Sequence, residues 1–228
     1  MRVLFAPAFA ASLLCFPYAA QNATSPANGN TPPVAAPAPN AGAMTTYRND
    51  ALHLSYSYPA AFTDASSLVG TALQAGLDRE SEGGKDVSHC LTVPFSAMDS
   101  SGGSFAIIVL GRADAACMKK NFTAAQLPDF TQSEVRELSA SGARPEFGQP
   151  AAFTTGGHPA ELMRGSFALP TGQRMQAMVA CVLLKPDVAC WQFLGSSVER
   201  LNSMSTFPVS LDGAPPAPLV PPAVLAKP

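Results

Sequence analysis

Two apolar segments, residues 174–184 and 188–195, constrain the fold more than any other part of the chain. A short turn around Pro186 separates them, and this arrangement predicts a β-hairpin. A turn centred just before Pro186 sets a register in which Cys181 faces Cys190 on the neighbouring strand. A two-residue loop makes them a non-hydrogen-bonded pair, in which side chains approach most closely, whereas a four-residue loop keeps the register but makes them a hydrogen-bonded pair. Either loop predicts a disulfide across the hairpin.

The first twenty residues have the layout of a secretory signal. Arg2 supplies a positive charge, residues 3–16 are almost entirely apolar, and Ala20 offers a small residue for cleavage. Cuts one residue earlier or three residues later also fit. An acylated Cys15 is disfavoured by the bulky residue before it, and a retained anchor is disfavoured because a span needs about 20 apolar residues. We therefore expect residues 1–20 to be removed and the protein to be secreted or periplasmic.

Four of the five cysteines remain after this cleavage. An even number of cysteines in an oxidising compartment predicts two disulfides, and four cysteines allow three pairings. With Cys181 and Cys190 paired by the hairpin, Cys90 and Cys117 are left. Cys90 lies on an expected strand and Cys117 shortly follows the next one, residues 105–110, so an antiparallel return brings them together. We predict the disulfides Cys90–Cys117 and Cys181–Cys190.

Composition divides the mature chain into one domain and two flanks. Residues 21–44 are rich in Pro, Ala, Asn and Gly and contain no charged residue, so they bury too little surface to offset chain entropy. Residues 214–228 are dense in Pro and predict an extended tail. We therefore expect a disordered linker at 21–44, a globular domain at 45–213 and a disordered tail at 214–228.

The charge of the chain excludes two classes of partner. Only 13% of residues are charged, the formal net charge is -2, and no basic run occurs. A nucleic-acid binder would carry a basic patch, and a helix lying on an anionic membrane would carry a Lys/Arg-rich face. We expect no nucleic-acid partner and no membrane insertion after signal cleavage.

Residue periodicity in the domain predicts alternating strands and helices. Residues 52–58 alternate apolar and polar side chains, as in a half-buried strand, and residues 105–110 are continuously apolar, as in a central strand. The remaining expected strands are residues 88–95 with an interruption at Pro94, a weak one around 152–153, and 161–169. The expected helices are residues 64–77, 114–120, 123–127 stopped by Pro128, 131–139 (with a strand as the alternative) and a last helix capped by Ser196 or Ser197.

Three short motifs resemble the PsbP-like domain family in its secreted bacterial branch. They are Tyr-Arg-Asn-Asp at residues 47–50, Tyr-Pro-Ala-Ala-Phe at 58–62, and Gly-His-Pro-Ala at 157–160, which precedes a strand, a hairpin and a final helix. The resemblance implies an α+β fold: an α/β/α sandwich with a mainly antiparallel sheet covered by helices on both faces. It implies accessory or assembly roles without a catalytic apparatus. The cysteine content departs from the photosynthetic members, so a photosystem role does not carry over.

The sequence offers no convincing catalytic, cofactor or metal site. Three histidines, His53, His89 and His158, are available for a Ser-His-Asp arrangement, but no Gly-x-Ser-x-Gly motif accompanies them. His53 is expected on the exposed face of the first strand and His158 in a turn. His89 precedes Cys90, and neighbours on a strand point to opposite faces, which argues against a shared metal ion.

The sequence therefore predicts a secreted, non-enzymatic accessory or binding protein without a cofactor. We expect it to be a monomer that binds an unknown protein or a component of the cell envelope. One alternative is a binder of small apolar, lipid-like ligands, with a cavity lined by Met175, Met178, Trp191, Phe193 and Met204. A hydrolase is the less favoured alternative.

Overall fold

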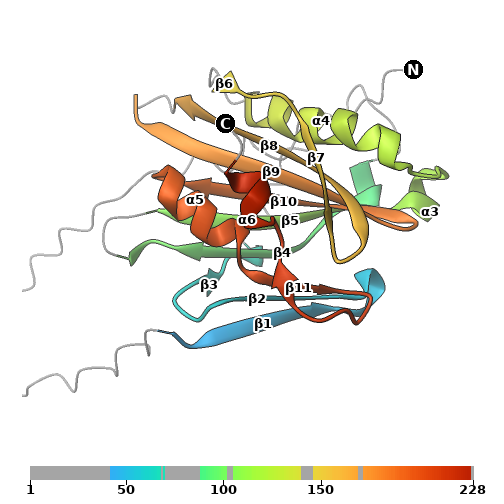
Figure 1. The fold of residues 1–228 in the computed structure, drawn as a ribbon, viewed down its shortest axis with the longest axis horizontal. Helices are drawn as coiled ribbons and strands as arrows, with labels where there is room; N and C mark the ends of the chain where they lie inside the picture. The colour runs from blue at the N-terminus through green and yellow to red at the C-terminus, as the bar shows by residue number, and fades with distance from the viewer. Residues whose placement is uncertain are drawn as a thin grey trace, which may run out of the picture.

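The computed structural model describes residues 42–67, 69, 88–101, 105–139, 146–168 and 172–226, and shows an α+β chain with much strand and few helices (Figure 1). The expected signal, nearly all of the expected linker and most of the helix expected at 64–77 lie outside these residues. The strands are β1 (Met44–Asn49), β2 (Leu54–Pro59), β3 (Thr63–Asp64), β4 (Leu91–Asp99), β5 (Ala106–Ala113), β6 (Glu146–Phe147), β7 (Ala151–Thr155), β8 (His158–Ala168), β9 (Arg174–Leu184), β10 (Asp187–Gly195), β11 (Pro208–Leu211) and β12 (Ala217–Pro218). The helices are η1 (Asp50–Leu52), η2 (Ser88–Cys90), α3 (Ala115–Met118), η4 (Ala124–Gln126), α4 (Leu127–Ser139), α5 (Val198–Ser205) and α6 (Pro222–Leu225).

The strands form one large and one small antiparallel sheet. The large sheet has eight strands in the order β3-β4-β5-β10-β9-β8-β6, with β7 also paired to β8. The small sheet has four strands in the order β1-β2-β11-β12. Pro94 interrupts β4 as expected, because the register with β5 shifts between Thr92 and Phe95. A proline has no N–H to donate to a ladder, so a bulge is one of the few places where a strand accepts it.

The centre of the large sheet separates two apolar cores. Successive side chains of a strand point to opposite faces. On β5, Val109 therefore belongs to one core and Ile108 to the other, and on β9 the same holds for Val179 and Ala180. All four residues are fully buried. The continuously apolar sequence of these strands follows from this burial on both faces.

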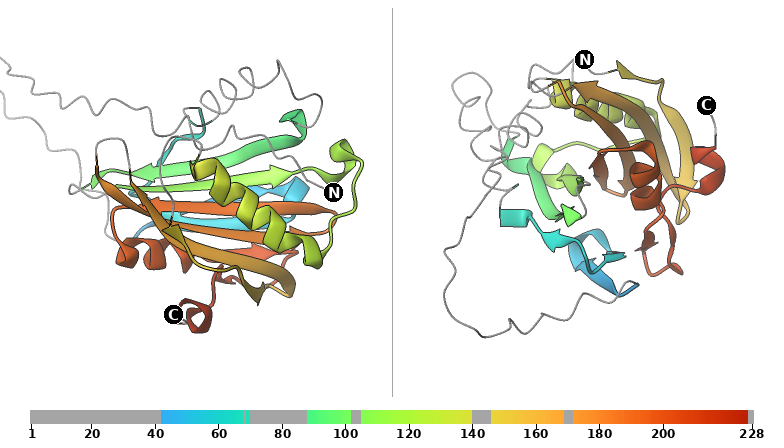
Figure 2. Two further views of the ribbon diagram at one scale, coloured as in Figure 1. Left: turned by 90° about the horizontal axis from the view of Figure 1, so that it is seen from above. Right: turned by 90° about the vertical axis from the view of Figure 1, so that its left-hand side faces the viewer.

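Helix α4 covers one face of the large sheet (Figure 2). Leu127, Phe130 and Val135 lie on its apolar stripe and pack in the core with strands β5, β9 and β10. The sequence predicts that Pro128 ends a helix, and this is wrong: Pro128 is the second residue of α4. A proline is tolerated in the first turn, since the N–H that it lacks has no partner inside the helix.

The small sheet and α5 together cover the other face. Tyr56 of β2 and Val209 of β11 share this second core with Leu201 and Met204 of α5. The sequence predicts helices on both faces of the sheet. In the structure α4 lies on one face, whereas on the other face α5 shares the cover with the small sheet. No helix in the described ranges has both the length and the apolar character that a membrane crossing requires.

The carboxyl-terminal segment is ordered where the sequence predicts disorder. Leu219 and Val220 are fully buried in the second core, and the Val220 N–H donates to the Ser205 carbonyl at 3.0 Å. Residues of β12 pair with β11, and α6 follows. The density of prolines around this pair predicts an extended tail without a hydrophobic pattern. An extended chain can nevertheless bury two large apolar side chains in a core, as Leu219 and Val220 do here. At the other boundary, Met44 already belongs to β1.

Candidate functional site

Several strands begin or end at the end of the molecule where α3 lies (Figure 1), and polar and charged residues occur at these strand ends and in the turns that join them. Strands β1, β5, β9 and β11 finish there, and β2, β4, β8 and β10 begin there. We call this region the polar end, and its residues are Arg48, Asn49, Asp50, His53, Arg112, Asp114, His158, Asp187, Asp212 and the pair Cys90–Cys117. Because neighbouring antiparallel strands exchange direction at a common edge, residues distant in sequence converge on this end.

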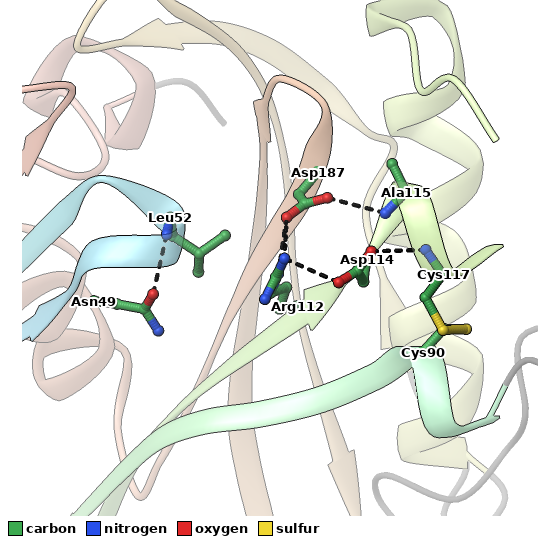
Figure 3. A network of polar contacts seen from close by, with 8 residues as sticks. All are labelled: Asn49, Leu52, Cys90, Arg112, Asp114, Ala115, Cys117 and Asp187. Atoms are coloured by element: carbon green, nitrogen blue, oxygen red, sulfur yellow. Dashed lines mark hydrogen bonds and ion pairs between the residues drawn. A yellow bond between two sulfur atoms is a disulfide. The ribbon is translucent and has the colours of Figure 1, made fainter. Parts of the chain in front are cut away.

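A groove of about 490 Å³ opens at the small-sheet side of the polar end. Its rim is built by the turn between β1 and β2. The Asn49 side-chain oxygen accepts a hydrogen bond from the Leu52 N–H at 3.0 Å and caps η1 (Figure 3). His53 then takes a left-handed conformation with φ 47°, which turns the chain back into β2. The groove is lined by Arg48, Asn49, Asp50, His53, Leu54, Ser55, Ser210, Asp212 and Gly213.

His158 fixes the opposite wall of the groove. Its Nε2 lies 3.1 Å from Asp212 Oδ2, and its Nδ1 lies 3.2 Å from the Leu183 carbonyl oxygen. Both ring nitrogens thus have partners, and no serine hydroxyl contacts this imidazole within the described part of the chain. The pair resembles two members of a hydrolase triad, but the nitrogen that would activate a serine faces a backbone carbonyl.

Three titratable side chains of the groove are free. Arg48, Asp50 and His53 are exposed, and none of these side chains has an ion pair or hydrogen bond among the residues that the structure describes. A guanidinium presents a planar fork of donors that matches a carboxylate or a phosphate. The groove can therefore bind an acidic group through Arg48. Residues 44–49 are mostly polar and lack a clear alternation of apolar side chains, so local pattern predicts neither strand β1 nor a binding role for Arg48.

An ion-pair network fixes the neighbouring part of the polar end (Figure 3). Asp187 is buried and accepts hydrogen bonds from Arg112 Nε at 2.8 Å and from the Ala115 N–H at 2.9 Å. Arg112 also contacts Asp114 at 3.0 Å. Asp114 in turn accepts from the Cys117 N–H at 2.9 Å and caps α3. The network ties the start of β10 to the end of β5 and to α3.

The structure joins both predicted cysteine pairs. Cys90 and Cys117 have Cα atoms 5.4 Å apart, and those of Cys181 and Cys190 are 4.0 Å apart. Cys181 faces Cys190 in the predicted hairpin register, with a two-residue loop between Leu184 and Asp187. Two disulfides are thus a property of the fold, one across the hairpin and one between η2 and α3.

His89 lies closer to the sulfurs than the sequence predicts. Its Nε2 is 3.6 Å from Cys90 Sγ, and these two atoms and Cys117 Sγ all lie within 4.8 Å of one another. The expectation of opposite faces assumed a strand, and it is wrong because Ser88–Cys90 is a 3₁₀ helix. Metal binding needs thiolates, whereas these two sulfurs are bonded to each other.

The methionine and aromatic residues considered for a ligand cavity fill the cores. Met178, Trp191, Phe193 and Met204 are buried in the second core, and Met175 is buried in the first. A second hollow, beside Phe130 and Glu134, has a volume of about 10 Å³. This is about the size of one water molecule and far below the 300–1,000 Å³ typical of ligand pockets.

Comparison with known proteins finds a weak likeness to PsbP. No family model matches the chain, and no curated protein matches it. Among solved structures, the solution structure of cyanobacterial PsbP from Synechocystis sp. PCC 6803 matches with a TM-score of 0.47 and 8% identity, over 77% of this chain and 89% of that one. A protein of unknown function from Pseudomonas aeruginosa, PA94, matches with a TM-score of 0.34 and 15% identity, over 71% of this chain and 88% of that one.

The first of these structures is a PsbP, the family that the three sequence motifs resemble, and the likeness of fold is weak. Both likenesses are too distant to say what this chain does.

Proposed function

We propose that the chain matures outside the cytoplasm and acts there as a non-enzymatic accessory protein that binds a partner at the groove. The partner is a protein or an envelope component that presents an acidic group to Arg48. Two disulfides and an amino-terminal segment with the layout of a secretory signal support the compartment.

One observation carries the proposed binding role: an exposed, unpaired arginine in a groove whose walls are already fixed. Asn49 holds the β1–β2 rim and the His158–Asp212 pair holds the opposite wall. Little ordering of the backbone around the groove is then required when a partner binds, and such preorganisation of the walls increases affinity.

The two alternatives from the sequence have less support. An apolar ligand would need a cavity lined by the methionine and aromatic side chains, and those side chains occupy the cores. A serine hydrolase would need a nucleophile beside His158, and the imidazole faces Leu183 and Asp212 instead. The packing of the cores and the contacts of His158 therefore favour neither an apolar-ligand binder nor a hydrolase over binding at the groove.

A site-specific crosslink tests this proposal. A photoreactive amino acid replaces Ser55 in the groove or, as a control, Gln132 on α4 at the opposite side of the large sheet. After irradiation in a cell-envelope preparation of the producing organism, we expect a discrete crosslinked product from position 55 and none from position 132.

The same experiment in an Arg48→Ala background identifies the group that binds. Loss of the position-55 product in Arg48→Ala, but not in Arg136→Ala on exposed α4 surface, is the expected result. A product that persists undiminished in Arg48→Ala, or that forms equally from position 132, contradicts the proposal.

A further inference from the structure

The two disulfides differ in their access to solvent. Cys181 and Cys190 are 0% and 5% exposed and lie in the first core beneath α4. Cys90 is 1% exposed, whereas its partner Cys117 is solvent-accessible at the end of the molecule. An external thiolate must reach a sulfur along the direction of the S–S bond, so only the Cys117 side of Cys90–Cys117 is open to such attack.

The imidazole of His89 lies beside Cys90 Sγ, the buried sulfur of this pair. Nε2 of His89 lies 3.6 Å from Cys90 Sγ, within the range of a sulfur hydrogen bond. His89 is itself exposed, so its ring can exchange protons with solvent. A neighbouring imidazole that donates a hydrogen bond stabilises a thiolate, and a more stable thiolate leaves a disulfide faster. Neither sulfur of Cys181–Cys190 has a histidine contact among the residues described.

We propose that Cys90–Cys117 is a reactive disulfide that exchanges with an external dithiol. A thiolate of the dithiol attacks Cys117 Sγ and forms a mixed disulfide, while the Cys90–Cys117 bond breaks. The electron pair of that bond goes to Cys90 Sγ, which leaves as a thiolate hydrogen-bonded by His89. The second thiolate of the dithiol then attacks the mixed disulfide at the dithiol's own sulfur and releases Cys117 as a thiolate. The dithiol is oxidised to its disulfide, and the cysteine pair is reduced by two electrons.

Opening this bond releases the connection between η2 and α3 while leaving the hairpin intact. The Asp114 N–H donates to the Cys90 carbonyl at 3.0 Å, and Asp187 holds the Ala115 N–H, so these contacts still position α3. The exchange is therefore compatible with a folded protein. It does not depend on a partner in the groove, so it can be measured on the isolated protein.

The test follows reduction of the folded protein by dithiothreitol, with thiols alkylated at intervals and their positions mapped by mass spectrometry. We expect Cys90 and Cys117 to become labelled at least tenfold faster than Cys181 and Cys190. Equal rates for the two pairs, or faster opening of Cys181–Cys190, would overturn the proposal.

Two further measurements test the atoms involved. With glutathione as the attacking thiol, the trapped adduct should lie on Cys117, with Cys90 as the free thiol, and an adduct on Cys90 would contradict the direction of attack. The variant His89→Ala should react about threefold more slowly than the wild type, since the leaving thiolate loses its donor. The matched variant His53→Ala, at another exposed histidine, should react at the wild-type rate. Equal rates for all three proteins would remove the role assigned to His89.

Discussion

The carboxylate of Glu134 on α4 accepts a hydrogen bond from the side-chain amide of Gln192 on β10, where the helix packs on the sheet. Both side chains are buried, and burial raises the pKa of Glu134 from 4.5 to about 7. The Gln192 Oε1 has no partner among the described residues. A protonated Glu134 carries an O–H that can donate to an amide oxygen, so the neutral carboxyl suits this site better than the carboxylate.

Because the pKa of Glu134 is higher in the folded protein, we expect the free energy of unfolding to fall as pH rises from about 4.5 to about 7. Below the lower value both folded and unfolded chains hold the Glu134 proton; between the two values the unfolded chain releases it while the folded chain keeps it. The free energy of unfolding therefore falls by about 3 kcal/mol across this window from this residue. The variant Glu134→Gln cannot ionise and lacks this fall. Urea unfolding at pH 5 and pH 8 measures it.

The control for this prediction is Glu146→Gln, which changes an exposed glutamate that forms an ion pair with Arg174. It should keep the pH dependence of the wild type. A difference in stability between the wild type and Glu134→Gln that stays constant from pH 5 to pH 8 would show that Glu134 does not titrate in this window.

Removal of Asp187 should cost far more stability than removal of Asp114, although both contact Arg112. The Asp187 side chain is 6% exposed and holds both Arg112 and the Ala115 N–H, whereas that of Asp114 is 29% exposed. Asp187→Ala removes the acceptor of Arg112 Nε and leaves the Ala115 N–H without its acceptor, although Arg112 keeps its contact with Asp114, and we expect a loss of about 3 kcal/mol. Asp114→Ala removes a half-buried ion pair, whose arginine keeps Asp187, and a helix cap, and we expect a loss of about 1 kcal/mol. Equal losses in thermal unfolding of the two variants would contradict the importance of burial.

The double variant Cys90→Ala/Cys117→Ala should lower the free energy of unfolding by about 3.5 kcal/mol, because the unfolded chain loses a ring closed over 27 residues. The measurement is urea unfolding without reductant. Wild-type protein in which only this bond has been reduced should show a similar loss. Unchanged stability in both would mean that the bond does not constrain the unfolded chain.

The carboxyl-terminal segment should contribute to stability through Leu219. This side chain is fully buried, so Leu219→Ala should destabilise the protein by about 3 kcal/mol. Val224 packs against the same core but is only partly buried, and Val224→Ala should cost about 1 kcal/mol. If neither substitution changes the melting temperature, residues 217–225 do not dock as the structure shows.

The parts of the fold that were predictable from sequence are those with strong local patterns. Tyr56 and its alternating neighbours give β2, the turn at Pro186 gives the register of β9 and β10, and Ser197 caps α5. In each of these cases the local signal agrees with the tertiary structure around it: alternation of apolar residues for β2, a turn for the hairpin, and a cap for α5.

The remaining parts depend on tertiary contacts that no local pattern reports. Leu219 and Val220 are isolated among prolines, and only the core beneath β11 and α5 explains their burial. The groove is likewise formed by two turns about 160 residues apart in sequence, which the small sheet brings together. His89 meets Cys90 because η2 replaces the expected start of the strand. Periodicity predicts elements better than it predicts where their ends meet.

The intact mass of the protein purified from the producing organism without reductant tests the proposed compartment most directly. We predict a chain that lacks about its first twenty residues and is four hydrogen atoms lighter than the fully reduced form, as two disulfides require. Recovery from the cytosol of a chain that keeps its amino-terminal segment, with Cys90, Cys117, Cys181 and Cys190 all reduced, would contradict the account.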